Sequence, residues 1–249
     1  MILPIPLSPL GFGAYQLGRI AGAKYVSAGR PMPSEKEADE LLNGVLDLGI
    51  TLIDTAPAYG LSEERIGKYL SSRRNEYNLV TKVGELTVNG KCSFDFTNKG
   101  MRASVENSLR ALKTDHVDSL LVHAPPDDLA MLHESDAVET MLLLKEEGKT
   151  KTIGFSGKTV EAQKEALLWS DVMMIEYSAA NQTNVEIIKR ADEQGIVVLF
   201  KKVLDSGHLE ANEAIQFLIK KSPWNEKHCT VIGSSRLDRI SQNARAFNV

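Results

Sequence analysis

Short apolar runs rich in β-branched residues alternate with helical patterns along the whole chain, and this alternation is the strongest constraint on the fold. Each run is followed by a segment in which apolar residues recur at helical spacing. The expected strands are 10–13, 51–54, 78–82, 118–123, 152–156, 172–176, 195–201 and 228–233. Continuous apolar strands that alternate with helices are typical of a parallel sheet covered by helices.

The predicted helices have clear start and stop signals. Ser34 and Glu37 form a capping box ahead of the first apolar face, and Gly49 follows the last turn. The later helices are expected at 63–70, 98–112, 135–147, 160–169, 184–194, 213–221 and 237–247. Segment 84–96 is predicted to be a polar loop, and 124–134 and 203–212 to be brief loops.

Eight strand–helix units in 249 residues, with no linker or composition break between them, indicate one domain over residues 1–249. We predict an α/β fold of the closed (β/α)8 type, a TIM barrel. A doubly wound open sheet has the same periodicity. It is disfavoured because no GxGxxG fingerprint follows the first strand.

Composition and charge exclude several classes of function. The formal net charge is −4, from 29 basic and 33 acidic residues that are interspersed, so neither nucleic acid nor a membrane surface is an expected partner. No apolar run reaches the length of a membrane span, and the apolar segment 1–17 lacks the basic start of a signal peptide. Cys92 and Cys229 are far apart, and no metal-ligand spacing occurs. The histidines other than His123 are therefore expected to be surface or loop residues, and Trp224 is expected to have a structural role; these histidines are His116, His133, His208 and His228. We expect a cytoplasmic monomer without a metal.

Polar side chains stand where the predicted strands end, and active sites of such barrels lie at the carboxyl ends of the strands. These residues are Asp54, Lys82, His123, Ser156, Glu176, Lys201 and Ser234, with Tyr59 on the loop after Asp54. Asp54 and Lys82 are expected to pair, because a buried unpaired charge is costly. The pair alone could simply cap the barrel. Its combination with Tyr59 and His123 favours a catalytic role.

Tyr59, Lys82, Asp54 and His123 together suit proton delivery to a carbonyl oxygen. A tyrosine has a pKa of about 10, and a neighbouring ammonium lowers this pKa by stabilising the phenolate. Asp54 would hold Lys82 charged and in place, and His123 would orient the carbonyl or share the proton. Side chains cannot supply a hydride, so this chemistry implies a nicotinamide cofactor.

Several segments resemble the signatures of the aldo-keto reductase family, and the resemblance extends over nearly the whole chain. They are 49–67, 80–82, 104–109 leading to Asp118 and His123, 153–156, and 231–234 followed by Arg239, Ile240 and Asn243. The resemblance implies a (β/α)8 barrel that binds NADPH and carries a tetrad of Asp54, Tyr59, Lys82 and His123. Tyr59 would be the general acid in reduction and the general base in alcohol oxidation.

The resemblance also implies a set of cofactor contacts, with departures from the family pattern. Ser156 matches the serine that contacts the nicotinamide carboxamide, but Gly157 replaces the asparagine beside it. Lys201 stands where many members stack an aromatic ring on the nicotinamide. The position of a common glutamine is Met174, with Glu176 or Gln182 as alternatives.

The adenosine end of the cofactor is expected at Ser234, Arg239, Gln242 and Asn243. Arg239 would bind a 2′-phosphate bidentately. Gly233 replaces a lysine that many family members have. NADPH is the expected cofactor, and NADH is the alternative.

Three functions remain open from the sequence. The leading hypothesis is an NADPH-dependent oxidoreductase acting on small aldehydes, ketones or sugars. A nucleotide-binding regulatory barrel with little turnover is the first alternative. A lyase or isomerase with Lys82 as a Schiff-base amine is the second. Short loops predict an open, shallow pocket, and segment 93–96 resembles members that oxidise aldoses or galactose-like sugars.

Overall fold

The computed structural model describes residues 2–18, 32–88, 91–205, 209–221 and 228–249, and in these residues the predicted barrel is present. Parallel strands close the barrel in the order β1-β10-β9-β8-β7-β6-β3-β2. They are β1 (Leu10–Gly13), β2 (Leu52–Asp54), β3 (Asn78–Val83), β6 (Val117–His123), β7 (Thr150–Ser156), β8 (Val172–Glu176), β9 (Val197–Lys201) and β10 (Cys229–Ile232). The (β/α)8 prediction is confirmed.

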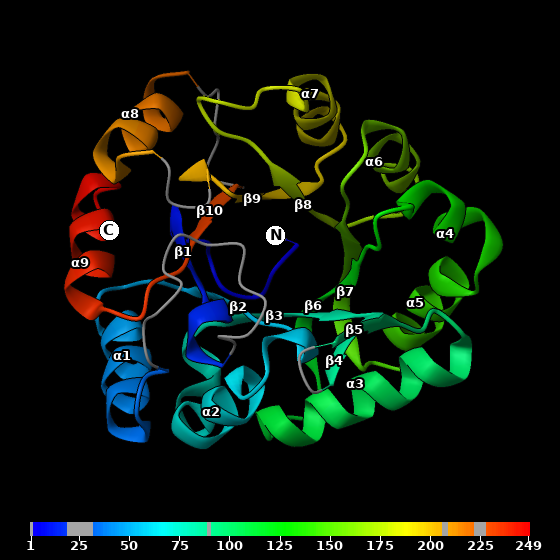
Figure 1. Cartoon of the computed structure of the whole chain (residues 1–249), viewed down its shortest axis with the longest axis horizontal. Coiled ribbons are helices and arrows are strands. Elements are labelled where there is room, and N and C mark those ends of the chain that lie inside the picture. The colour runs from blue at the N-terminus through cyan, green and yellow to red at the C-terminus, as the bar shows by residue number, and fades with distance from the viewer. Residues whose placement is uncertain (1, 19–31, 89–90, 206–208, 222–227) are drawn as a thin grey trace.

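Helices surround the strands as an outer ring, seen end-on in Figure 1. They are α1 (Glu35–Asp47), α2 (Ser62–Tyr69), α3 (Asn98–Leu112), α4 (Asp128–Glu134), α5 (Ala137–Glu146), α6 (Val160–Ala166), α7 (Val185–Glu193), α8 (Ala211–Lys221) and α9 (Leu237–Ala246). Short 3₁₀ turns occur at η1 (Ala14–Leu17), η2 (Pro57–Tyr59) and η3 (Ser71–Glu76). The Ser34–Glu37 capping box that begins α1 is present as predicted.

Two apolar layers hold the barrel together. The larger layer packs the outward-facing strand residues, such as Phe12 and Ile53, against the helices. The smaller layer fills the barrel interior with Leu52, Val80, Leu121, Val172, Met174, Val197, Leu199 and Cys229. This interior is therefore a solid core and not a channel. The candidate polar side chains therefore lie at the ends of the strands, outside this apolar interior.

Two loop predictions were wrong. Segment 84–96 contains an antiparallel hairpin of β4 (Glu85–Val88) and β5 (Lys91–Phe94), which follows β3. All four residues of β5 are exposed, so the sequence shows no buried face by which to recognise a strand. Segment 124–134 contains the short helix α4, and the next helix, α5, begins only at Ala137.

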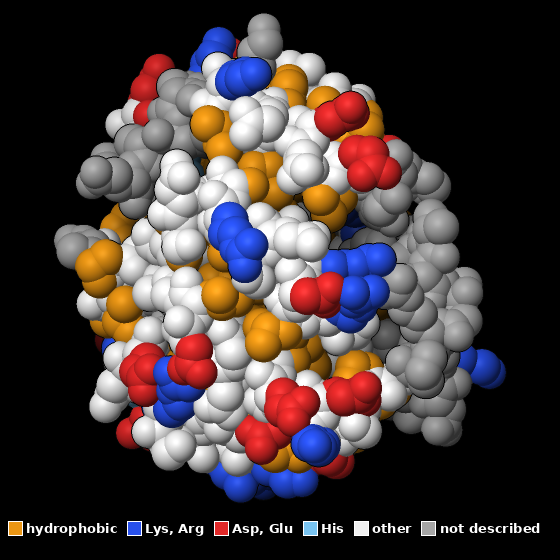
Figure 2. Space-filling model, turned by 90° about the vertical axis from the view of Figure 1, so that its left-hand side faces the viewer, with side chains coloured by type: hydrophobic (Ala, Val, Ile, Leu, Met, Phe, Trp, Pro, Cys, Tyr) orange, Lys and Arg blue, Asp and Glu red, His pale blue; other side chains and the backbone are white. Residues whose placement is uncertain are grey.

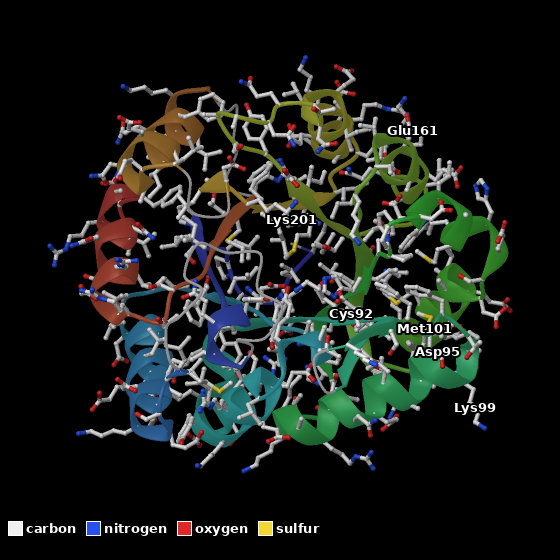
Figure 3. All side chains as sticks on the ribbon, viewed as in Figure 1. Cys92, Asp95, Lys99, Met101, Glu161 and Lys201 are labelled. Carbon is white, nitrogen blue, oxygen red and sulfur yellow. The ribbon has the colours of Figure 1, made fainter. Side chains whose placement is uncertain are left out.

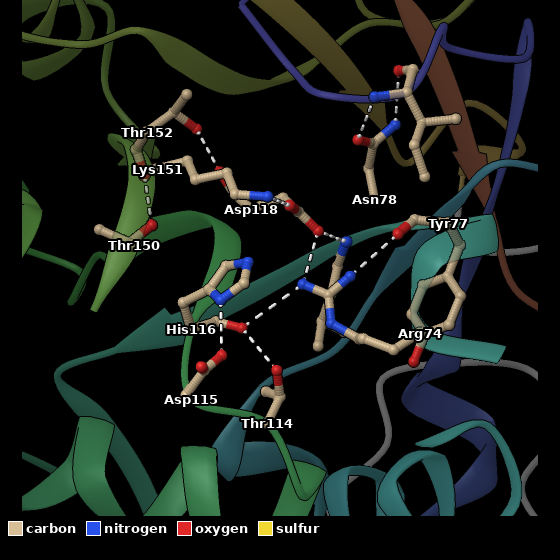
Figure 4. Close-up of polar contacts among 12 residues, drawn as sticks. Arg74, Tyr77, Asn78, Thr114, Asp115, His116, Asp118, Thr150, Lys151 and Thr152 are labelled. Atoms are coloured by element: carbon tan, nitrogen blue, oxygen red, sulfur yellow. Dashed lines mark hydrogen bonds and ion pairs between the residues drawn. The ribbon is translucent and has the colours of Figure 1, made fainter. Parts of the chain in front are cut away.

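The amino-terminal end of the barrel carries a buried ion cluster around Asp118, shown in Figure 4. Asp118 Oδ2 accepts hydrogen bonds from Arg74 Nη2 (2.7 Å) and the Leu79 N–H (2.8 Å). Its Oδ1 lies 3.0 Å from Lys151 Nζ. Two cations and an amide thus compensate one buried carboxylate, which ties β6 to β3 and β7 at the end opposite the candidate site.

The surface over α1, α8 and α9 carries mixed charge. Figure 2 shows acidic and basic side chains interspersed on this face, with no extended area of one sign. In the described part of the chain, no helix is long and apolar enough to span a membrane. Nor do His, Cys, Asp and Glu side chains of the described residues gather into a metal-binding group.

Candidate active site

An ion pair between Asp54 and Lys82 lies at the carboxyl ends of the adjacent strands β2 and β3. Lys82 Nζ donates to Asp54 Oδ1 at 2.5 Å and to the Thr55 carbonyl at 2.9 Å. Both side chains are almost completely buried, with exposed fractions of 1% and 6%. Burial raises the pKa of Asp54, and the charge of Lys82 opposes that rise. The predicted pairing is confirmed.

Tyr59 lies directly beside this ion pair. The Lys82 ammonium is 4.7 Å from the centroid of the Tyr59 ring, and the Tyr15 ring packs edge-on against Tyr59 at 5.1 Å. The 3₁₀ turn η2 holds the tyrosine, and Gly60 leaves this turn with φ of 60°, a conformation that favours glycine. Gly18 is also required, because a Cβ there would meet the Tyr59 carbonyl oxygen at 2.1 Å.

His123 faces Tyr59 from the end of β6, with the two ring centroids 6.0 Å apart. Its Nδ1 lies 2.9 Å from Glu85 Oε2, on the first strand of the hairpin. Burial lowers the pKa of His123 to about 4, although Glu85 favours the charged form. The imidazole is therefore neutral near pH 7. A neutral imidazole retains one N–H donor.

Helix α2, which follows Tyr59, is fixed by buried polar residues at its first turn. Ser62 Oγ accepts from Thr55 Oγ1 at 3.0 Å and donates to the Ala14 carbonyl at 3.0 Å. Glu63 accepts from Thr81 Oγ1 at 2.6 Å and from Ser108 Oγ at 3.0 Å. These bonds attach α2 to the neighbouring strands and to α3. They set the position of the Tyr59 turn.

Replacing Glu63 by glutamine is expected to remove one source of pH-dependent stability. Burial raises the pKa of Glu63 from 4.5 to about 7. Between pH 4.5 and about 7, Glu63 binds more protons in the folded state than in the unfolded state. The free energy of unfolding therefore falls as pH rises through this range, by about 3 kcal/mol in total. Urea unfolding from pH 4.5 to 8 should therefore show a flatter pH dependence in Glu63→Gln. Glu64 is the exposed neighbour of Glu63, so Glu64→Gln is the control. If the free energy of unfolding depends on pH equally in Glu63→Gln and Glu64→Gln, the prediction is contradicted.

The predicted nicotinamide contacts Ser156 and Lys201 touch each other. Lys201 Nζ, at the end of β9, donates to Ser156 Oγ at 3.0 Å and to the Gly157 carbonyl at 2.9 Å. Figure 3 places Lys201 well inside the ring of helices, whereas Lys99 and Glu161 lie at its outer edge. Gly157 cannot be replaced by the asparagine of the family pattern without a shift, because a Cβ there would meet the Phe155 ring at 2.3 Å.

Of the three candidates for the common glutamine position, only Glu176 lies at the end of its strand. Met174 is buried in the barrel interior, and Gln182 is an exposed loop residue. Glu176 Oε2 accepts from Lys202 Nζ at 2.5 Å, and its Oε1 accepts from Asn181 Nδ2 at 3.0 Å. Both carboxylate oxygens of Glu176 therefore have partners other than Lys201.

The predicted adenosine contacts surround the start of α9. Ser234 and Asn243 are buried, while Arg239 and Gln242 are exposed. Arg236 pairs with Asp238, and among the described residues no carboxylate pairs with Arg239. Gly233 cannot carry the family lysine without a shift, because a Cβ there would lie 2.5 Å from the Gly13 carbonyl oxygen.

This donor set fits a nicotinamide dinucleotide phosphate. Ser156 Oγ accepts from Lys201 and keeps its own proton for a carboxamide oxygen. The Arg239 guanidinium, on the exposed face of the first turn of α9, can bind a phosphate. The residues expected at the nicotinamide end lie at the ends of β7 and β9, and those expected at the adenosine end follow β10. The catalytic candidates lie on β2, η2, β3 and β6.

Two neighbours of the site were missed in the sequence. Tyr15 comes two residues after β1, so the rule that sites lie after strand ends was sufficient to find it. Glu85 was hidden because 84–96 was predicted to be a loop. His228, predicted to be a surface or loop residue, is instead buried, and its Nδ1 accepts from the Val198 N–H at 3.2 Å. His208 and Trp224 lie outside the described residues.

Comparisons with known proteins show the family of this chain. The model of the aldo/keto reductase family matches residues 9–216. A solved structure described as an aldo-keto reductase of Pseudomonas aeruginosa has a TM-score of 0.87 and 35% identity, covering 98% of this chain and 90% of that one. The chain therefore belongs to the aldo/keto reductase family.

Two further similar proteins are a curated relative and a solved structure. L-galactose dehydrogenase of Arabidopsis thaliana is 34% identical over 160 residues, which cover 61% of this chain and 46% of that protein. The chain thus aligns with about half the length of this relative. An aldo-keto reductase of Klebsiella pneumoniae, solved in complex with NADPH, has a TM-score of 0.74 and 22% identity, with 98% and 86% coverage. At this identity the likeness concerns the fold.

Proposed function

We propose that this chain is an NADPH-dependent oxidoreductase that interconverts small carbonyl compounds and alcohols, with Tyr59 as the general acid and base. The observation that carries the proposal is the arrangement around Tyr59. A buried Asp54–Lys82 pair lies under the ring, and His123 faces it from β6. We further propose that residues 1–249 form a single catalytic domain.

Each member of the tetrad has a distinct task in the proposed reaction. Tyr59 gives its proton to the carbonyl oxygen, and the Lys82 ammonium stabilises the negative charge that develops on the phenol oxygen. Asp54 fixes Lys82 by an ion pair, and the neutral His123 orients the carbonyl oxygen by donating its Nε2–H. NADPH, when bound, supplies the hydride that none of these side chains can provide.

The substrate class that we propose is small aldehydes, ketones and sugars. Its support is the name of the relative L-galactose dehydrogenase, a sugar-oxidising member. The alternative is a nucleotide-binding regulatory barrel with little turnover. The complete tetrad favours the enzyme, because a purely regulatory site would not need a buried ion pair under a tyrosine. A Schiff base on Lys82 is disfavoured, because its ammonium is paired with Asp54.

Arg239→Ala is expected to weaken NADPH binding about 10- to 100-fold and to leave NADH binding unchanged, since a charge-assisted contact to the 2′-phosphate is lost. Titration of each nucleotide into the purified protein, followed by protein fluorescence, measures both affinities. Arg245→Ala removes another exposed arginine of α9 and serves as the control. Equal losses for NADPH and NADH would contradict the role of Arg239. Failure of both nucleotides to bind the unaltered protein would overturn the proposed function.

A further inference from the structure

Lys201 is a half-buried cation that has no counter-ion among the described residues. Its ammonium donates to Ser156 Oγ and to the Gly157 carbonyl, which are both neutral groups. Among the described residues, no carboxylate lies within ion-pair distance of it. An ammonium that is partly withdrawn from water is usually paired, so this arrangement requires an explanation.

The carboxylate that stands in register with Lys201 is paired with the neighbouring residue, Lys202. Glu176 stands opposite Lys201 in the register of β8 and β9. Lys202, with φ of 56°, is turned back so that its own ammonium reaches Glu176 Oε2 at 2.5 Å. A lysine in a left-handed conformation costs about 1 kcal/mol. The Lys202 backbone therefore adopts an unfavourable conformation. In this conformation Lys202 pairs with Glu176, and Lys201 is left without that carboxylate.

The charges around Lys201 come from several strands, and together they disfavour its ammonium form. The facing groups are Asp54 on β2, Lys82 on β3, His123 on β6, Lys158 after β7, Glu176 on β8 and Lys202. Asp54 is paired with Lys82, and Glu176 with Lys202. Burial and the neighbouring lysines lower the pKa of Lys201 to about 7. Its charge can therefore change under ordinary conditions.

The expected occupant of this part of the site exists in two charge states. The nicotinamide ring is a cation in NADP⁺ and is neutral in NADPH. Ser156, which holds the Lys201 ammonium, is also the expected contact of the carboxamide on that ring. An aromatic side chain at position 201 would tolerate both rings, whereas an ammonium repels the cationic ring only.

On the basis of the proposed function, we propose that Lys201 makes this site discriminate between the two oxidation states of the nicotinamide cofactor. The ammonium form accepts the neutral ring of NADPH and opposes the cationic ring of NADP⁺. Binding of NADP⁺ then drives the ammonium proton of Lys201 to solvent, while binding of NADPH does not. The site favours carbonyl reduction at low pH and becomes open to the oxidised cofactor as pH rises.

The test is the ratio of the dissociation constants of NADP⁺ and NADPH, measured by calorimetric titration at pH 6 and pH 8.5. Two like charges in one partly buried site are expected to change this ratio about 10- to 100-fold. The unaltered protein should show a high ratio at pH 6 and a lower one at pH 8.5. Titration of the shared 2′-phosphate affects both nucleotides and cancels in the ratio.

Three variants separate the charge of Lys201 from other effects. Lys201→Met should have a low ratio at both pH values, because no positive charge remains. Lys201→Arg should have a high ratio at both, since a guanidinium does not lose its proton. Lys164→Met removes an exposed ammonium of α6 that is not among the groups facing Lys201, and it should behave as the unaltered protein. Titration of Glu63 persists in all the variants, so it cannot produce these differences.

Proton release provides a second readout that does not depend on turnover. At pH 7, calorimetry in two buffers of different ionisation enthalpy should show release of part of a proton on NADP⁺ binding, and none with Lys201→Met. A ratio that is independent of pH in the unaltered protein, or is the same in Lys201→Met, overturns this inference and leaves the proposed function standing. Failure of both nucleotides to bind overturns the two together.

Discussion

Tyr59→Phe is expected to lower kcat for carbonyl reduction by about 10²- to 10⁴-fold, the usual contribution of a positioned general acid. The ring, its contact with Lys82 and its packing against Tyr15 all persist in the variant. Only the transferable proton is lost. Cofactor affinity should therefore be unchanged, and the whole effect should fall on the chemical step.

The measurement is steady-state reduction of a small aldehyde with NADPH, together with a fluorescence titration of the cofactor. Tyr15→Phe is the matched control, because it deletes a phenol hydroxyl from the ring that packs against Tyr59 and should retain most of the turnover. A Tyr59→Phe protein that keeps the kcat of the unaltered chain would show that another group delivers the proton. His123 would then be the next candidate, since its ring faces Tyr59.

Lys82→Met is expected to lower the free energy of unfolding by about 3–5 kcal/mol, which is the cost of leaving one partner of a buried ion pair alone. Asp54 would keep a buried carboxylate whose cationic partner, Lys82, is gone. The pKa of Asp54, already raised by burial, would rise further. Protonation of Asp54 in the folded state would then relieve the strain at low pH, so the loss of stability should grow as pH increases.

Urea denaturation of Lys82→Met at pH 4.5 and pH 8 measures this effect. The double variant Asp54→Asn/Lys82→Met has no buried charge in the pair, so it should recover most of the lost stability. Recovery would separate the electrostatic cost from the change in shape. A loss below about 1 kcal/mol in the single variant would mean that water or another cation compensates Asp54.

The alternation of strands and helices predicted most of the fold, because the strands of the barrel are mostly buried and contain continuous apolar runs. The closed order of the strands and the Asp54–Lys82 pair followed from this pattern. The hairpin β4–β5 did not, because its exposed second strand has no apolar face. Glu85 was missed for the same reason, since its contact with His123 depends on the hairpin.

Some features of the site depend on contacts that no local pattern contains. Lys201 was predicted as a cofactor contact, but its lack of a counter-ion among the described residues depends on the pairing of Glu176 with Lys202. Gly157 and Gly233 depart from the family pattern, and the structure gives a steric reason for each, in Phe155 and in Gly13. His228 is buried and accepts a hydrogen bond from the Val198 N–H, which lies 30 residues away in sequence.

The Asp118 cluster gives the barrel an anchor that is remote from the chemistry. Its partners, Arg74, Leu79 and Lys151, all lie at the end of the barrel where the strands begin. Effects of substitutions at well-separated sites usually add. Stability gained at this end should therefore offset losses caused by altering the opposite end. A laboratory programme that first reinforces the surroundings of Asp118 would have a wider choice of mutations around Tyr59 and Lys201 when it selects for new substrates.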